Sequence, residues 1–187
     1  MKGGVIVATL VLVAGLAQAG AARAADEGGF SPEEIVAAAG SVFGAVSEGL
    51  ADVVQKAFAD HGRPTAYIAG EEVSGAFAVG LRYGKGKLAR KTAGERPIYW
   101  QGPSVGFDFG GNASKTFVLV YNLKTDEDIF QRFPAGEGGF YFVAGVGITY
   151  QQSGEVIVAP IRTGVGLRAG ANVGYVHYTR DHSWLPF

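Results

Sequence analysis

The chain contains no cysteine among its 187 residues. It therefore has no disulfide, no thiol nucleophile and no lipid-modified cysteine of the lipoprotein type, although an oxidising compartment remains open to it. Histidine is also scarce, with three residues. His177, Asp181, His182 and Ser183 are close in sequence, but their spacing matches no metal-binding or proton-relay motif, and no serine lies in a G-x-S-x-G elbow. We therefore predict no catalytic residues, no metal site, no cofactor and no enzymatic activity.

The chain also lacks an excess of positive charge. Its formal net charge is −1, and removal of the first 24 residues takes away two basic side chains and leaves −3. This balance argues against nucleic acid as a partner. The basic residues are nevertheless concentrated within residues 82–96, whereas residues 126–128 form a compact acidic segment.

Long apolar runs are missing except near the N-terminus. Residues 5–16 are apolar and uncharged, but they fall short of the roughly 20 residues that a membrane-spanning helix needs. They follow Lys2 and precede two A-x-A sites that end at Ala19 and Ala24, which is the pattern of a cleaved secretory signal peptide. We expect cleavage after Ala19 or Ala24 and export to the periplasm, with an uncleaved anchor as the alternative.

The first folded element is expected to be a helix at residues 31–61. Ser31 and Glu34 form a capping box, and apolar residues then recur every three or four positions. Gly62 ends the pattern, because glycine readily adopts the left-handed conformation at a helix C-terminus. Interior glycines permit a break near residues 47–49. Packing on a core is favoured over contact with a membrane surface, since the polar face of the helix carries few basic residues.

From residue 64 onwards the apolar period changes from 3.6 to two, which indicates strands. Residues 117–121 are apolar at every position, so both faces of that strand must be covered. A Gly-Lys-Gly-Lys sequence at residues 84–87 is predicted to be a turn. The predicted strands are residues 67–69, 75–83, 105–110, 117–121, 143–150, 156–158 and 164–175.

Glycine, with 30 residues, recurs on one face of several of these strands. A face without side chains suits a sheet that closes tightly or packs closely on a helix. Short connections favour antiparallel order. The sequence thus predicts a mainly β (α+β) fold: a small, glycine-rich, largely antiparallel β-barrel of six to eight strands with a packed N-terminal helix. The expected divisions are a signal peptide at 1–24, a linker at 25–30 and one domain at 31–187, with helix 31–61, barrel 64–180 and tail 181–187.

Two groups of residues are candidates for ligand contacts. Lys85, Lys87, Arg90 and Lys91 could bind an anion such as the phosphate of a phospholipid or lipopolysaccharide head group. They do not form a Walker loop, and a solvated hairpin tip is the alternative. Trp100, Phe107 and Phe109 could line an apolar cavity that accepts a lipid. The alternative for these aromatic residues is that they simply fill the core.

The region of residues 30–180 resembles the EipA-type proteins, a family of small periplasmic proteins linked to cell-envelope integrity. The resemblance rests on a leading helix, a glycine-rich strand at residues 73–83 and the sequence Trp100-Gln101-Gly102-Pro103-Ser104. It continues through Gly-x-x-x-Gly-Gly at residues 106–111 and an apolar strand that ends in Asn122. The order of these pieces is also similar to the SYLF lipid-binding domain. The resemblance implies a small β-barrel with a packed helix, no known enzymatic activity and a role in the envelope.

Three functions follow as hypotheses. The leading one is a non-enzymatic periplasmic protein that supports envelope integrity by binding a lipid or an envelope-assembly protein. The first alternative is a small integral outer-membrane barrel, which would fit the alternating strands. The second is a lipid-directed hydrolase, which would depend on His177, Asp181 or His182. The sequence gives no indication of the oligomeric state.

Overall fold

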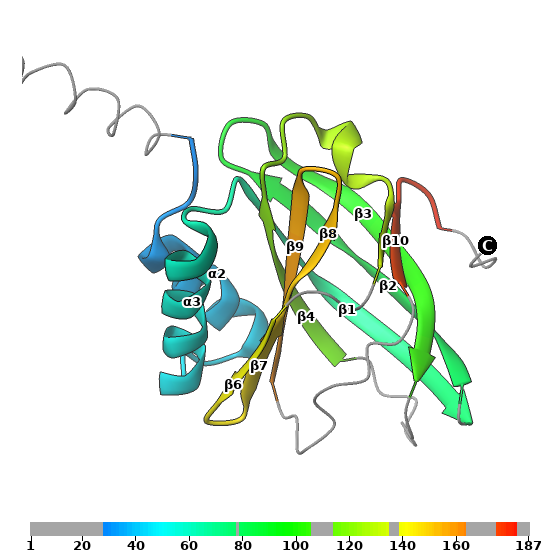
Figure 1. Cartoon of the computed structure of the whole chain (residues 1–187), viewed down its shortest axis with the longest axis horizontal. Coiled ribbons are helices and arrows are strands. Elements are labelled where there is room, and N and C mark those ends of the chain that lie inside the picture. Colours follow the sequence, from blue (N-terminus) through cyan, green and yellow to red (C-terminus); the bar gives the residue numbers. More distant parts are fainter. Residues whose placement is uncertain (1–27, 78, 106–113, 135–138, 164–174, 183–187) are drawn as a thin grey trace, which may run out of the picture.

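The computed structural model describes residues 28–77, 79–105, 114–134, 139–163 and 175–182, and it contains two α-helices, a short 3-10 helix and ten strands in this part of the chain (Figure 1). The helices are α2 (Pro32–Phe43), α3 (Glu48–His61) and the 3-10 helix η1 (Asp126–Ile129). The strands are β1 (Ala66–Phe77), β2 (Val79–Arg90), β3 (Gly94–Val105), β4 (Ser114–Tyr121), β5 (Arg132–Pro134), β6 (Phe140–Val143), β7 (Val146–Thr149), β8 (Gln151–Ser153), β9 (Val156–Thr163) and β10 (Tyr175–Thr179).

The helical region begins and ends where its capping residues predict. The Ser31 hydroxyl accepts a hydrogen bond from the Glu34 backbone N–H at 3.2 Å, and the Glu34 carboxylate accepts one from the Ser31 N–H at 2.7 Å, so the capping box is confirmed. The helix end at His61 is also confirmed, with Gly62 at φ 74°. The region consists of two helices, because Gly44 ends α2 at φ 87° and Ser47 caps α3.

All strand pairs are antiparallel, as predicted, and they form one curled sheet. The hydrogen-bonded order is β5-β10-β3-β2-β1-β4-β9-β7-β6, with β8 paired to β9. The sheet curls far enough for β5 to lie against β8, where the Ser153 hydroxyl donates a hydrogen bond of 2.9 Å to the Gln131 side-chain oxygen. The predicted barrel-like fold is confirmed, with ten described strands in place of six to eight.

Three details of the predicted strands are wrong. Residues 84–87 do not form a turn but lie within β2, and the turn lies instead between β2 and β3. The glycine-rich strand at residues 73–83 is a hairpin in which Val73 pairs with Tyr83. The strand at residues 143–150 is interrupted by a turn at Ala144 and Gly145, whose φ angles are 46° and 83°. Residues 106–113 and 164–174, which include most of two further predicted strands, lie outside the described residues.

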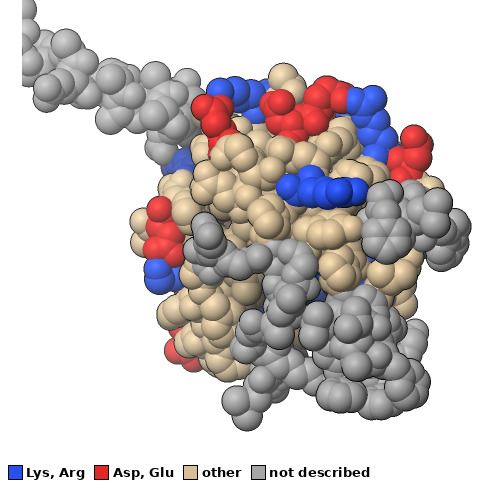
Figure 2. All heavy atoms as spheres, turned by 45° about the vertical axis from the view of Figure 1, so that its right-hand side comes forward, with Lys and Arg blue, Asp and Glu red and all other residues tan. Residues whose placement is uncertain are grey.

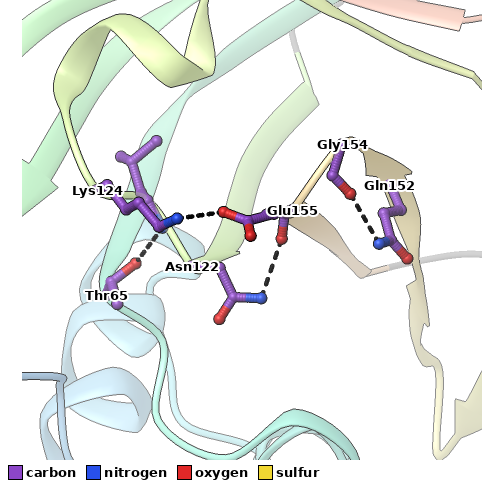
Figure 3. Close-up of a pocket in the computed structure, with 7 residues that line it drawn as sticks. Thr65, Asn122, Lys124, Gln152, Gly154 and Glu155 are labelled. Carbon is purple, nitrogen blue, oxygen red and sulfur yellow. Dashed lines mark hydrogen bonds and ion pairs between the residues drawn. The ribbon is translucent and has the colours of Figure 1, made fainter.

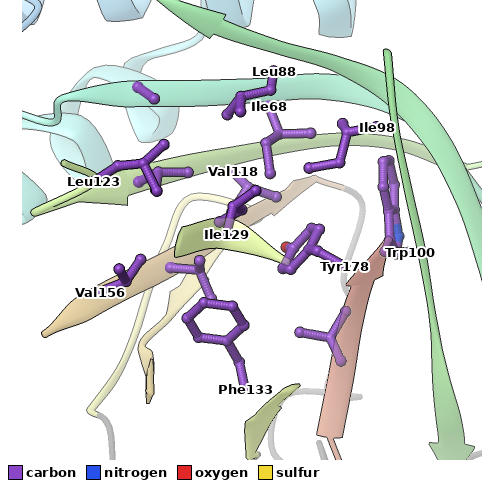
Figure 4. Close-up of a cluster of buried hydrophobic side chains, with 14 residues drawn as sticks. Ile68, Leu88, Ile98, Trp100, Val118, Leu123, Ile129, Phe133, Val156 and Tyr178 are labelled. Atoms are coloured by element: carbon purple, nitrogen blue, oxygen red, sulfur yellow. The ribbon is translucent and has the colours of Figure 1, made fainter. Parts of the chain in front are cut away.

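The core lies on both faces of β4, as the uninterrupted apolar sequence predicts. Val118 and Val120 point into the barrel, where they join a cluster that includes Ile68 and Ile98 (Figure 4). Phe117, Leu119 and Tyr121 point to the opposite face and pack against α2 and α3. These side chains are at most 2% exposed. The strand is therefore shared by two clusters, one inside the barrel and one beneath the helices.

The two helices cover one outer face of the sheet. In Figure 1 they lie beside the part of the sheet that contains β4, β7 and β9, and their buried residues share a cluster with Ile148 and Ile161 from that part. Among the described residues, neither helix has the length and apolar character needed to cross a membrane.

Candidate functional site

The interior of the barrel changes from apolar to polar along β1. Glu72 on β1 pairs with Gly84 on β2, which pairs with Trp100 on β3, and Trp100 in turn pairs with Tyr178 on β10. Residues that lie directly opposite one another on neighbouring strands share a face of the sheet. Because Trp100 and Tyr178 belong to the interior cluster, the side chain of Glu72 points to the inside of the barrel as well.

Glycines create the space for Trp100. A Cβ atom on Gly84 would lie 1.9 Å from Cε2 of the indole, and one on Gly70 would lie 2.9 Å from Cη2. Trp100 is consequently 3% exposed, because its indole packs directly on the backbone of the neighbouring strands. Its Nε1–H donates a hydrogen bond of 2.8 Å to the Glu72 carboxylate, which meets the need of a buried indole for an acceptor.

Two guanidinium groups lie near the Glu72 carboxylate. The Arg162 Nη2 atom is 3.6 Å from Glu72 Oε1, and the side chain of Arg162 is 32% exposed. Arg82 is 5% exposed, and its Nη2 atom donates a hydrogen bond of 3.2 Å to the Tyr175 carbonyl. Burial lowers the pKa of the Arg82 guanidinium, and the charge of Glu72 opposes that shift while Arg162 adds to it. We call Glu72, Arg82, Trp100 and Arg162 the interior polar cluster.

The interior polar cluster is suited to binding a charged group. Its guanidinium groups can donate paired hydrogen bonds to a carboxylate or a phosphate. It contains no nucleophile with an adjacent base, which covalent catalysis requires. Within the described ranges, no group of three or more His, Asp or Glu side chains is placed to hold a metal ion.

Of the four basic residues expected to bind an anion, Lys85, Lys87 and Arg90 lie on β2 and Lys91 follows it directly. Lys85 and Lys87 are exposed on the outer face of β2, and Lys87 forms an ion pair of 2.9 Å with Glu95. Arg90 forms an ion pair of 2.7 Å with Asp126 and also donates hydrogen bonds to two carbonyl groups. Lys91 forms an ion pair with Glu34, at 3.0 Å. Three of the four residues thus have an acidic partner on another segment, and anion binding by them stays a prediction.

The aromatic candidates are only partly described. Trp100 lies in the interior polar cluster, whereas Phe107 and Phe109 lie outside the described residues. Among the hydrolase candidates, His177 is half-buried on β10, and burial lowers the pKa of its imidazole. The His182 ring lies 5.9 Å from the Tyr99 ring.

Glu72, Arg82 and Arg162 are not among the site residues predicted from the sequence. Arg82 alternates with Leu81 and Tyr83 in the sequence, and this alternation does not show which face of the strand is inside. The available signal was its position on the same face as Gly84 and Gly86, because a strand face lined with glycine is the closely packed one. A charged residue on that face indicates an interior ionic group.

The surface hollow shown in Figure 3 is a weaker candidate. It measures about 530 Å³ and is lined by residues of the loop after β4 and the β8–β9 turn. Its polar groups bond to one another: Lys124 pairs with Glu155, and Asn122 Nδ2 donates a hydrogen bond of 3.0 Å to the Glu155 carbonyl. Thr65 Oγ1 accepts one of 3.0 Å from the Leu123 N–H. These groups therefore have internal partners and do not require a ligand.

Charges of both signs are mixed along one rim of the molecule, as Figure 2 shows. Asp126 accepts from Arg90 and also pairs with Arg96, at 2.8 Å, and Arg180 pairs with Glu127. A rim on which opposite charges neutralise one another does not present a strong field to a charged partner. The interior polar cluster is therefore the better candidate site.

The fold and the cluster define a class: a small, curled antiparallel barrel with a helical layer on one outer face and an ionic group inside. The chain belongs to the EipA family, described as envelope integrity protein A, whose sequence profile matches residues 28–187. It is also similar to a crystal structure of a beta-barrel-like, uncharacterized protein from Brucella abortus. The identity is 43%, the TM-score is 0.78, and the match covers 86% of this chain and 99% of that one. A comparison with curated proteins found no match.

These comparisons confirm the resemblance drawn from the sequence. The family description names an envelope role and is not that of a known enzyme family, so the chain is an envelope-associated protein by family. The sequence motifs at Trp100 and Asn122 that carried the resemblance lie within the matched region.

Proposed function

We propose that the protein is a non-enzymatic component of the periplasm that supports the integrity of the cell envelope by binding an envelope lipid. The observation that carries this proposal is membership of the envelope integrity family over residues 28–187, which is nearly the whole chain after the expected signal peptide. The secretory pattern at residues 1–24 supports the location. An interior ionic group in a barrel is consistent with a binding function.

Two features weigh against an integral membrane barrel. A transmembrane barrel has an outward apolar band and a polar interior. Here the interior is apolar over most of its length, with Ile68, Val118 and Phe133 fully or almost fully buried. Two helices also cover part of the outer face, against Phe117 and Ile161.

A chromosomal deletion tests the proposal. The deletion strain should lose resistance to detergent and to EDTA, and resistance should return with the full-length gene. A matched allele that lacks residues 1–24 should not restore it, because the product would not be exported. Restoration by both alleles would contradict a periplasmic function, and an unchanged deletion strain would contradict an envelope function.

Fractionation separates the proposal from its main alternatives. The protein should be released with the other periplasmic proteins by osmotic shock. Recovery only in detergent extracts of the outer membrane would support the membrane barrel instead. Purification of a stoichiometric protein partner with no lipid would favour an envelope-assembly protein as the ligand and would contradict the lipid part of the proposal.

A further inference from the structure

One edge of the sheet is free among the described strands. β6 is the last strand in the hydrogen-bonded order, and β7 is its one neighbour in the described part of the chain (Figure 1). An unpaired edge offers a row of N–H and C=O groups to another strand. The opposite end of the sheet is protected, because β5 carries Arg132 and Pro134 and lies against β8. β6, with the sequence Phe-Tyr-Phe-Val, has neither a charge nor a proline.

The turn between β6 and β7 decides which backbone groups point to the free edge. Its two residues have φ angles of 46° and 83°, and Val143 pairs with Val146 across it. The pair that flanks a two-residue turn exchanges hydrogen bonds, and hydrogen-bonded and open pairs then alternate along the hairpin. Tyr141 and Val143 therefore direct their backbone groups to β7, whereas Phe140 and Phe142 direct theirs outward.

The same two phenylalanines present their side chains to solvent. Phe140 is 47% exposed and Phe142 is 43% exposed. Their ring centroids are 6.3 Å apart with an interplanar angle of 15°, so the rings form a stacked pair. Residues 138–154, which contain both strands of the hairpin, include no charged side chain. A molecule that reaches this edge meets aromatic surface and unpaired backbone groups without charge.

We propose that two copies of the protein pair through β6 in an antiparallel dimer with a two-fold axis at Tyr141. In this register Tyr141 lies opposite the partner's Tyr141, and Phe140 lies opposite the partner's Phe142. Residues of the same face meet, because the side-chain period of a strand is two. The outward backbone groups of both phenylalanines face each other and form four hydrogen bonds between the copies. The four rings lie on one face as two cross-strand aromatic pairs.

The self-complementary geometry favours a second copy as the occupant. Phe140 and Phe142 provide both the outward backbone groups and the exposed rings, and each lies one position from Tyr141. A register shifted by two residues would place one of these phenylalanines opposite a residue of a turn or a loop, and so would form fewer hydrogen bonds. Two copies also approach here without repulsion between like charges, since the hairpin has none.

A bilayer fits this edge less well. The unpaired N–H and C=O groups of an open sheet edge find no partner in hydrocarbon, so such edges are not inserted into lipid. A second strand supplies the missing partners and covers the two rings at the same time. The inference does not depend on the proposed lipid ligand, because it concerns the edge of the sheet and not the interior of the barrel.

The size of the contact indicates a weak, reversible dimer. A phenylalanine buries about 150–250 Å² when it is fully covered, so the four partly exposed rings contribute roughly 350 Å². Lasting interfaces bury about 1,200 Å² or more. We therefore expect a dissociation constant between about 10 µM and 1 mM.

Cross-linking tests the register. The chain contains no cysteine, so a single introduced cysteine can form a disulfide only between copies. Tyr141→Cys would place two cysteines in an open antiparallel pair with Cα atoms about 4.5 Å apart, which is within the range of a disulfide. Two Val143→Cys residues would lie more than about 10 Å apart in the same dimer. Val73→Cys, on the exposed part of β1, measures random collision.

Under mild oxidation of the mature protein at 100 µM, Tyr141→Cys should form dimers at least tenfold faster than either other variant. Melting curves check that each variant is folded. Equal rates for Tyr141→Cys and Val73→Cys would overturn the proposed register.

Sedimentation equilibrium of the mature protein from 10 µM to 1 mM tests the dimer without a cysteine. The mean mass should rise from that of a monomer towards that of a dimer, and Phe140→Ser/Phe142→Ser should weaken the association at least tenfold. Val73→Ser/Leu81→Ser is the matched control, since these residues are 45% and 38% exposed on β1 and β2. The control should associate as the parent does.

Three results of these measurements would overturn the inference. One is a monomer at every concentration, and another is equal association of the phenylalanine variant and its control. The third is a monomer that floats with phosphatidylethanolamine–phosphatidylglycerol vesicles only when both phenylalanines are present, which would assign the edge to a membrane surface instead.

Discussion

Trp100 lies inside the barrel because the residues beside it have no side chains. Gly84 and Gly70 lie against the indole, and a methyl group on either would overlap it. Both glycines are in extended strands, so their role here is spatial rather than conformational. The same absence of side chains allows Glu72 to reach the indole N–H, at 2.8 Å.

Replacement of one of these glycines should therefore destabilise the protein. Gly84→Ala would place Cβ 1.9 Å from Trp100 Cε2, and we expect the free energy of unfolding to fall by about 1–3 kcal/mol, the usual cost of overpacking. Gly139→Ala is the control, because no heavy atom lies within 4 Å of its Cβ position. Urea unfolding measures both. Equal stability of the two variants would show that the indole has room to move.

Glu72 is expected to contribute more than a hydrogen bond. Glu72→Ala removes the acceptor of Trp100 and the carboxylate nearest Arg162, and it should lower the free energy of unfolding by about 3 kcal/mol, since breaking a buried ion pair leaves a charge uncompensated. Glu72→Gln keeps the acceptor and should cost less. Urea unfolding of both variants tests this, and a Glu72→Gln variant as stable as the parent would assign the main contribution to the hydrogen bond rather than to the charge.

At the scale of elements, Arg90 connects β2 to the loop that follows β4. Its guanidinium pairs with Asp126 at 2.7 Å and donates to the carbonyls of Leu123 and Lys124 at 3.2 and 2.9 Å. The Arg90 side chain is 16% exposed and that of Asp126 is 13% exposed. This arrangement fixes the position of η1 over one end of the barrel.

Arg90→Ala should be one of the more damaging changes at a basic residue. We expect a loss of about 1–3 kcal/mol in the free energy of unfolding, because Asp126 and two carbonyl groups would lose a nearly buried donor while Arg96 remains paired with Asp126. Lys85→Ala, on the exposed outer face of the same strand, should change it by less than about 0.5 kcal/mol. Thermal or urea unfolding distinguishes the two. A small effect of Arg90→Ala would return this residue to the group of candidate anion contacts.

The carboxyl group at the N-terminus of α2 should make the stability of the fold depend on pH in the acidic range. Hydrogen bonds from the Ser31 backbone N–H and the Lys91 ammonium hold the pKa of the Glu34 carboxyl below its ordinary value of 4.5. A pKa that is lower in the folded state stabilises the fold above about pH 4.5, and this stabilisation is lost as the pH falls through the folded-state pKa.

Glu34→Gln tests this dependence. The variant keeps a hydrogen-bond acceptor at the cap but has no carboxyl to protonate, so its thermal midpoint should fall less between pH 5 and pH 3 than that of the parent. Melting curves across this range provide the measurement. Parallel curves for parent and variant would show that other carboxyl groups account for the acid sensitivity.

The sequence predicted elements whose signals are local. The capping box at Ser31 and the end of α3 at Gly62 depend on neighbouring residues only, and the two covered faces of β4 follow from its uninterrupted apolar sequence. The turns were harder to predict from the sequence, because the alternation of apolar residues with period two continues through a tight hairpin. The turn at Ala144 and Gly145 therefore looked like the interior of one strand.

The candidate site was not predictable for a different reason. Glu72, Arg82 and Arg162 come from three strands, and only the register brings them to one face. A single sequence shows which residues alternate but does not show which strands are neighbours.

At the scale of the whole molecule, the barrel has two different outer surfaces and one polar interior end. Helices α2 and α3 cover one side of the sheet (Figure 1), which carries Phe117 and Ile161. The outer face of β2 presents Lys85 and Lys87 to solvent. We place the proposed function on the interior side, at the interior polar cluster that contains Arg162, and anion binding by the exterior lysines is the alternative. These two assignments can be separated in cells.

The most direct measurement is detergent survival of the deletion strain complemented with three exported alleles at equal protein levels. The wild-type and Lys85→Gln/Lys87→Gln alleles should restore survival, whereas Arg162→Gln should not, because only the last removes a charge of the interior polar cluster. Full rescue by Arg162→Gln together with failure of the lysine variant would contradict the account and would place the function on the outer face of β2.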